Sequence, residues 1–133
     1  MELTVAFSTN DGEHLITGDH AGQAKFFDVY RYSGDEVEFV ERRENSKDTG
    51  DESMRHGDPE KAKKSLSALD GVDAWANPRF GPNLPRLLKK LVCVVVRVET
   101  IDEGAELVRQ HIDQVVEQHE AGEARTHVVL KPE

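Results

Sequence analysis

Two histidines in polar, glycine-containing stretches are the residues of this chain best suited to bind a metal. His20 lies within Gly18–Gly22, and His56 stands before a glycine in a long polar stretch. Imidazole is the commonest side-chain metal ligand, and glycines let the main chain bend sharply and approach a ligand. The local pattern alone still favours a tight turn with an exposed histidine, because a site needs partner groups from elsewhere.

A second group of candidates surrounds an expected helix start. Asn83, at the end of the segment Gly81–Asn83, is the predicted N-cap of an apolar helix. Free backbone N–H groups and the helix dipole favour an anion there, and Arg79 is a nearby cation. The alternative is an ordinary capped helix. Cys93 has the soft sulfur that iron–sulfur clusters prefer, but its apolar neighbours favour a structural role.

Size and charge restrict the classes of partner. The 133 residues predict one domain, 1–133, and the net charge of −9 comes from 26 acidic and 17 basic residues. Such a surface repels nucleic acids and anionic membranes. A single cysteine permits no internal disulfide. We find no signal sequence and no apolar run of the roughly 20 residues that cross a membrane, so we expect a cytoplasmic protein.

Turn residues divide the first part of the chain into expected strands at residues 3–8, 25–32 and 36–42. The short turn between the last two predicts an antiparallel hairpin. Between residues 41 and 61 the only apolar side chain is Met54, so we expect a mobile loop over about 44–57.

The second part of the chain alternates expected helices and strands. Helices are predicted from residue 58 to Gly71 and over 84–91, with a strand at 72–76 between them. Residues 92–98 are almost all apolar, which predicts a central strand buried on both faces. A capping box at 100–103 predicts one long helix that ends at Gly122. Residues 122–133 are a C-terminal extension, in which 126–130 are suited to a final edge strand.

Taken in order, several of these segments resemble the dinitrogenase iron–molybdenum cofactor biosynthesis family. The similarity covers roughly residues 3–121. It is carried by a histidine loop before an aromatic strand, a His-Gly pair, a Gly-Val-Asp strand, a Gly-Pro-Asn helix start and a final Thr-Ile-Asp-Glu helix: Gly18–Ala24, Phe26–Tyr30, His56-Gly57, Gly71–Asp73, Gly81–Asn83 and Thr100–Ala105.

The resemblance implies an α/β, ribonuclease H-like three-layer fold with a mixed five-stranded sheet flanked by helices. It also implies a carrier that holds an iron- or molybdenum-containing sulfide cluster for a cofactor-assembly or recipient metalloprotein, as in nitrogen fixation. His20 is then the first metal ligand and His56 the second. The expected cofactor-binding residues are His20, Gly22, Arg79, Gly81 and Asn83.

The histidine loop departs from the family pattern at three positions. Asp19, Ala21 and Gln23 stand where the family has glycine, phenylalanine and arginine. A cluster-free regulatory or protein-interaction domain on the same fold therefore remains the alternative.

Catalysis is not expected. Ribonuclease H-type nucleases hold two metal ions with clustered carboxylates, one of them on the first strand, and residues 3–8 contain none. Asp28 on the second strand is a lone carboxylate. No nucleophile elbow or phosphate-binding loop is present.

Overall fold

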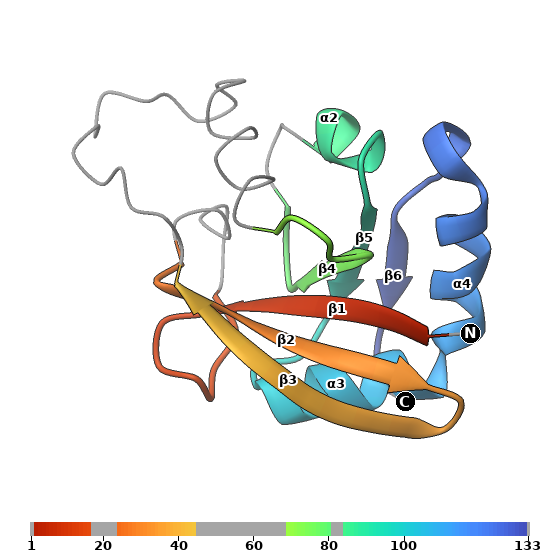
Figure 1. The fold of residues 1–133 in the computed structure, drawn as a ribbon. Coiled ribbons are helices and arrows are strands. Elements are labelled where there is room, and N and C mark those ends of the chain that lie inside the picture. Colours follow the sequence, from red (N-terminus) through yellow and green to blue (C-terminus); the bar gives the residue numbers. More distant parts are fainter. Residues whose placement is uncertain (1, 17–23, 45–68, 81–83, 133) are drawn as a thin grey trace, which may run out of the picture.

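A mixed six-stranded sheet forms the centre of the protein (Figure 1). The computed structural model describes residues 2–16, 24–44, 69–80 and 84–132. The strand order is β3-β2-β1-β4-β5-β6. In chain order, the elements are β1 (Glu2–Thr9), β2 (Phe26–Ser33), β3 (Glu36–Glu44), β4 (Ala74–Asn77), α2 (Leu84–Leu88), β5 (Val92–Val96), α3 (Ile101–Gln110), α4 (Ile112–Glu120) and β6 (Val128–Leu130).

The first three strands form an antiparallel meander, as the sequence predicts. β1 pairs with β2 along its whole length, from Glu2 opposite Ser33 to Thr9 opposite Phe26. β2 then pairs with β3 through a tight turn in which Gly34 has a φ of 61°, a backbone conformation that glycine adopts without strain. The predicted hairpin is confirmed.

The other half of the sheet is parallel. β1 pairs with β4, β4 with β5, and β5 with β6, all in parallel. Every residue of β5 is buried, as a strand covered on both faces requires. The prediction of an interior strand is therefore confirmed. β5 ends at Val96, two residues earlier than expected, and β6 is the edge strand next to it. The expected sheet of five strands is wrong by one, because Val128–Leu130 pairs with β5 as an edge strand.

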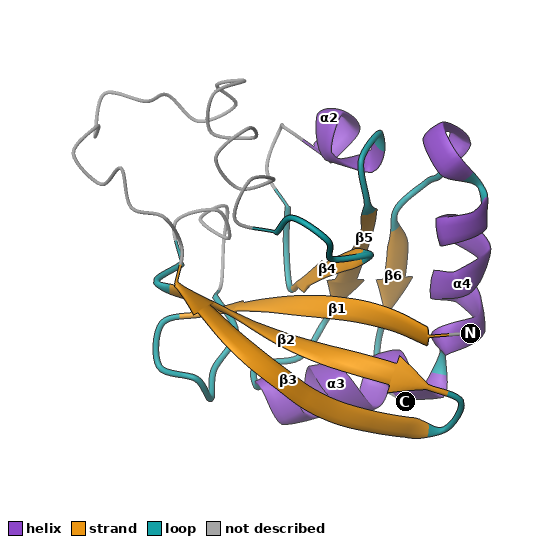
Figure 2. Cartoon of the chain, viewed as in Figure 1, coloured by secondary structure: helices purple, strands orange, loops and turns teal. Residues whose placement is uncertain are grey.

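Helices cover both faces of the sheet (Figure 2). Alternate side chains of β5 point to opposite faces. Val94 packs with Val108 of α3 and Val115 of α4, whereas Cys93 packs with Leu87 of α2 in a second cluster. These two cores, one on each side of the sheet, confirm the three-layer α/β architecture.

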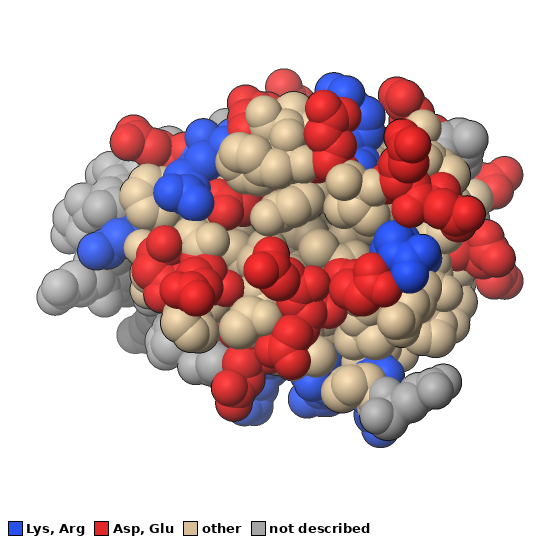
Figure 3. All heavy atoms as spheres, turned by 90° about the horizontal axis from the view of Figure 1, so that it is seen from below, with Lys and Arg blue, Asp and Glu red and all other residues tan. Residues whose placement is uncertain are grey.

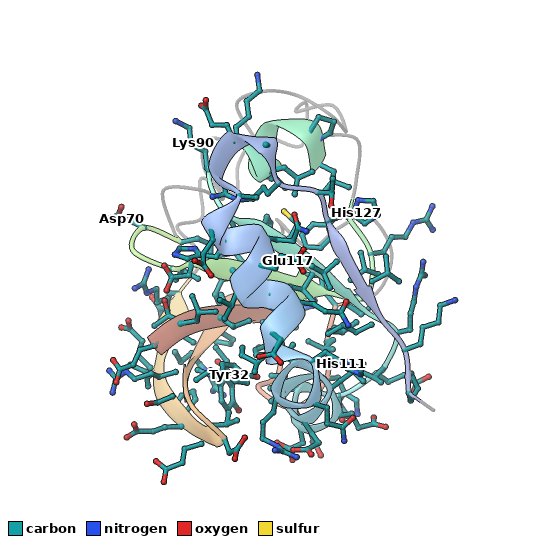
Figure 4. The ribbon with its side chains drawn as sticks, turned by 90° about the vertical axis from the view of Figure 1, so that its right-hand side faces the viewer. Tyr32, Asp70, Lys90, His111, Glu117 and His127 are labelled. Atoms are coloured by element: carbon teal, nitrogen blue, oxygen red, sulfur yellow. The ribbon has the colours of Figure 1, made fainter. Side chains whose placement is uncertain are left out.

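The expected long C-terminal helix is two helices. α3 ends at Gln110 and α4 begins at Ile112, because His111 has a non-helical backbone with φ −122° and ψ 28°. Figure 4 labels His111 at this break. The apolar period continues across it, since Val108 and Val115 pack in the same core. Periodicity reports the buried face of each segment, and it did not reveal that the helix axis changes direction.

Other predicted helices and loops differ or lie outside the described residues. α2 ends at Leu88 rather than at residue 91, after which a turn brings Leu91 back to the core. Most of the helix expected from residue 58, and the loop expected over 44–57 apart from Glu44, lie outside the described residues. Among the described helices, none is long and apolar enough to cross a membrane.

Candidate functional site

The carboxyl ends of β1 and β4 lie side by side in the sheet, because the two strands are parallel neighbours. β1 ends at Thr9, which pairs with the first residue of β2, Phe26. β4 ends at Asn77. Ligands of open α/β sheets bind outside the carboxyl ends of parallel strands, so this end of the sheet is the first place to look for a site.

Three buried polar side chains form a hydrogen-bonded group at this end of the sheet. Ser8 on β1 and Trp75 and Asn77 on β4 are each at most 2 % exposed. The Trp75 indole donates to Ser8 Oγ at 2.8 Å. With its amide oriented to satisfy both groups, Asn77 accepts from the indole at 2.8 Å and donates to Ser8 Oγ at 2.9 Å. Such a closed network fixes the two strand ends relative to each other.

Two aromatic rings pack against the tryptophan of this polar group. Trp75 makes edge-to-face contacts with Phe27 at 5.9 Å and with Phe80 at 5.5 Å between ring centroids. Phe80 immediately precedes the segment 81–83, which lies outside the described residues, and Leu84 follows it. Both residues pack in the core that contains Trp75.

The residues that flank segment 17–23 pack in that same core. Ile16 lies before this segment and Ala24 after it, and both contact the cluster around Trp75. In addition, Asn10 Oδ1 accepts a hydrogen bond from the backbone of Lys25 at 2.9 Å, which joins the two sides of the connection. The described ends of the two segments that the sequence assigned to the site therefore pack in the same hydrophobic core.

A loop that follows β1 adds an ion pair to this end. His14 Nδ1 lies 2.8 Å from Asp11 Oδ2. Asp11 Oδ1 accepts the backbone N–H groups of Glu13 and His14, each at 2.8 Å. These amides and the imidazole hold the pKa of the Asp11 carboxyl far below its usual range. In turn, the hydrogen bond that the imidazole donates to the Asp11 carboxylate raises the pKa of His14.

Side chains of β2 and β3 pack against this loop. Asp28 on β2 is 1 % exposed, and Arg42 on β3 donates to its two carboxylate oxygens at 2.8 and 3.2 Å. The Arg42 guanidinium lies against Gly12, where an added Cβ would overlap it, and over the ring of Phe26. Gly12 also has a φ of 81°. The loop after β1 thus depends on a glycine and on an ion pair whose carboxylate is buried.

The structure places only one of the sequence-predicted site residues. Arg79 is exposed on the connection that leaves β4. His20, Gly22, His56, Gly81 and Asn83 lie outside the described residues. Within the described ranges, no group of three or more histidine, cysteine, aspartate or glutamate residues is placed to hold a metal ion.

Cys93 is part of the core, as its apolar neighbours in the sequence predict. It is fully buried beside Leu87 and Trp75, and burial raises the pKa of the thiol to about 12. A neutral, buried thiol is a poor metal ligand, because the thiolate is the binding form.

Two pairs near the site were missed by sequence reasoning. The Asp11–His14 pair could have been predicted from the sequence, since the turn residues Asn10–Gly12 place an acid three positions before a histidine. The Asp28–Arg42 pair has none, because it depends on the register of two strands.

The surface charge is uneven. Figure 3 shows acidic side chains gathered on the face seen from below, where α3 lies in Figure 1. α3 carries three exposed acidic residues, Asp102, Glu103 and Glu106. An anionic ligand is therefore disfavoured there.

Comparison with protein families shows to which family the chain belongs. A model of the family described as dinitrogenase iron-molybdenum cofactor matches residues 1–124 of the 133. The chain belongs to this dinitrogenase iron-molybdenum cofactor family. The matched range contains β1 to β5, all three described α-helices and the carboxyl ends of β1 and β4. A comparison with curated proteins gives no match.

Family membership gives the site a chemical context. The family's description links the chain to the iron–molybdenum cofactor of dinitrogenase. This cofactor is a metal–sulfide cluster, and such clusters are usually anionic.

Proposed function

We propose that this protein binds an iron- or molybdenum-containing sulfide cluster at the carboxyl ends of β1 and β4. It holds the cluster for transfer to a cofactor-assembly or recipient metalloprotein. The observation that carries the proposal is the convergence of Ile16, Ala24, Phe80 and Leu84 on the core around Trp75, in a chain whose family is linked to this cofactor. These residues flank the two segments in which the family pattern has its histidine loop and helix start.

The described part of the site suits a carrier. The buried group of Ser8, Trp75 and Asn77 keeps its geometry whether or not cargo is bound, because its side chains are hydrogen-bonded to one another. Arg79, exposed on the connection that leaves β4, adds positive charge for an anionic cluster. Few protein ligands are expected, since the cluster must leave again. His20 is the proposed main ligand and His56 a second one.

The protein is proposed to bind rather than to catalyse. Between Leu3 and Thr9, β1 carries no carboxylate, and the Asp28 carboxylate is taken up by Arg42. A two-metal nuclease site therefore lacks its ligands on these strands. Cleavage of an RNA–DNA hybrid in Mg²⁺ or Mn²⁺, abolished by Asp28→Asn, would contradict this assignment.

The binding proposal is tested by anaerobic titration of the protein with isolated iron–molybdenum cofactor, followed by visible absorbance. We expect a large loss of affinity for His20→Ala and a smaller one for His56→Ala. His127→Ala is the matched control, because His127 is exposed beside the edge strand β6 (Figure 4), and it should bind like wild type. Equal binding by wild type and His20→Ala overturns the ligand assignment. No binding by any variant favours the cluster-free interaction domain.

A further inference from the structure

β6 forms an open edge of the sheet. It is the last strand in the strand order, and among the described strands it pairs only with β5 (Figure 1). The Arg97 N–H donates to the Leu130 carbonyl at 3.0 Å, so Leu130 directs its backbone groups toward β5. In a parallel pair, neighbouring residues of one strand direct their backbone groups to opposite sides. Val129 therefore directs its N–H and C=O away from the sheet, where another extended chain can pair with them.

The side chains at this edge combine an apolar position with two cations. The register that sets Val96 opposite Leu130 brings the next residues, Arg97 and Lys131, side by side. Val96 and Leu130 pack in the core on the side of α3 and α4. Because successive side chains of a strand alternate between faces, Val129, Arg97 and Lys131 lie on the other face. Val129 is 43 % exposed there.

Arg97 and Lys131 are exposed cations that have no hydrogen-bond or ion-pair partner among the described residues. The carboxylate of Glu99, two residues after Arg97, instead acts on His14 in the loop after β1. Like charges on opposite residues of neighbouring strands repel each other, and an anionic group between them would remove this repulsion. Other arginines of the described chain donate to carboxylate or carbonyl oxygens: Arg31, Arg42, Arg43, Arg109 and Arg125.

We propose that the outer edge of β6 docks an extended, acidic segment of a partner protein, which adds to the sheet as a further strand. Main-chain hydrogen bonds form with the outward N–H and C=O of Val129, and an apolar side chain of the segment covers the exposed valine. A carboxylate of the segment lies between Arg97 and Lys131. Because β6 has only three residues, the contact is short and suits a transient partner.

Other occupants fit this edge less well. A second copy of the chain that paired through the same strand would bring the cations of both copies together, which is repulsive. Nucleic acid is disfavoured by the net charge of −9. At the opposite edge of the sheet, the pairing of β3 shifts register beside Val29 and Tyr30, and such irregularities hinder the addition of a strand.

This docking edge is independent of the proposed cluster site. The cluster site lies at the carboxyl ends of β1 and β4, whereas β6 is the edge strand on the far side of β5. β6 also lies beyond residues 1–124, which match the family. Family membership therefore does not supply this surface.

The probe is the synthetic peptide acetyl-Val-Thr-Val-Thr-Glu-Thr-Glu-amide, and the control peptide has glutamine in place of both glutamates. Two-dimensional NMR of the ¹⁵N-labelled full chain follows each backbone amide during the titration. We expect the acidic peptide to shift the Val129 amide and to slow its hydrogen exchange, because this N–H becomes hydrogen-bonded. The glutamine peptide should bind more weakly.

Two kinds of variant separate charge from backbone pairing. Arg97→Gln combined with Lys131→Gln should weaken binding of the acidic peptide about 2–25-fold, because two exposed ion pairs are lost, and should not affect the glutamine peptide. Lys89→Gln combined with Lys90→Gln is the matched control, since both lysines are exposed on the turn after α2, and it should bind like wild type. Val129→Pro removes the outward N–H without breaking the pairing with β5, so binding of both peptides should be lost.

Circular dichroism confirms that each variant is folded. If neither peptide shifts the Val129 amide of wild type, docking at β6 is refuted. Equal binding of the two peptides by wild type would refute an acidic partner. A Val129 shift that depends on protein concentration alone would identify a second copy as the occupant and overturn the proposal. In each of these cases the carrier function stands, because its own titration does not involve β6.

Discussion

Because the Asp28 carboxylate is buried and the Arg42 guanidinium is not, substitutions of the two partners of this ion pair should reduce stability by different amounts. The Asp28 side chain is 2 % exposed, whereas that of Arg42 is 43 % exposed. Loss of Arg42 leaves a charge inside the protein without a partner. Loss of the Asp28 charge leaves a guanidinium that water can reach. Arg42→Met should therefore destabilise the protein more than Asp28→Asn.

The expected sizes follow from burial. Arg42→Met should cost more than Asp28→Asn, because it leaves the buried Asp28 carboxylate without its partner. Asp28→Asn keeps the shape and one acceptor, so about 1–3 kcal/mol is expected. The double variant should be more stable than Arg42→Met alone, since it contains no unpaired buried charge.

Urea unfolding followed by tryptophan fluorescence measures these free energies. Trp75 is the only tryptophan of the chain, and at 2 % exposure it reports the folded core. Circular dichroism provides a second probe of the same transition. A double variant that is less stable than Arg42→Met would refute the reasoning, because the loss would then come from packing of Arg42 on Phe26 and Gly12 rather than from the buried charge.

Three further predictions address the core and the loop after β1. Tyr32→Phe should lower the free energy of unfolding by about 1–2 kcal/mol, because the buried hydroxyl donates to the Ala105 carbonyl at 2.9 Å; an unchanged urea midpoint would contradict this. Cys93, whose pKa burial raises to about 12, should react with iodoacetamide at pH 8 only after unfolding, and rapid labelling of the native protein would show an accessible thiol. Gly12→Ala should lower the free energy of unfolding by more than about 1 kcal/mol, because Gly12 has a φ of 81° and lies against Arg42. A variant with the same thermal unfolding midpoint as wild type would contradict this prediction.

Much of the fold could be predicted from local pattern. The described strands differ from those expected by at most two residues at either end, because turn residues and apolar runs are local signals. The continuous apolar run at Val92–Val96 identified a strand buried on both faces. The break at His111 could not be predicted, since it reflects how α3 and α4 fit against the sheet.

The site was less predictable from sequence. Family resemblance indicated which loops matter, and membership of the family is confirmed. Residue spacing could not show that Ser8 meets Trp75, 67 positions away, because only the parallel pairing of β1 with β4 brings them together. The same holds for Asp28 and Arg42. Side chains contributed by different strands acquire their roles from register, which local sequence does not encode.

The most direct test of the carrier proposal is whether the purified protein retains a cluster. The protein is incubated anaerobically with isolated iron–molybdenum cofactor, separated from free cofactor by gel filtration, and analysed for iron, molybdenum and acid-labile sulfide. The proposal predicts that all three elute with the protein in the ratio of the added cofactor, at about one cluster per chain. Elution of the protein without metal and sulfide would contradict it.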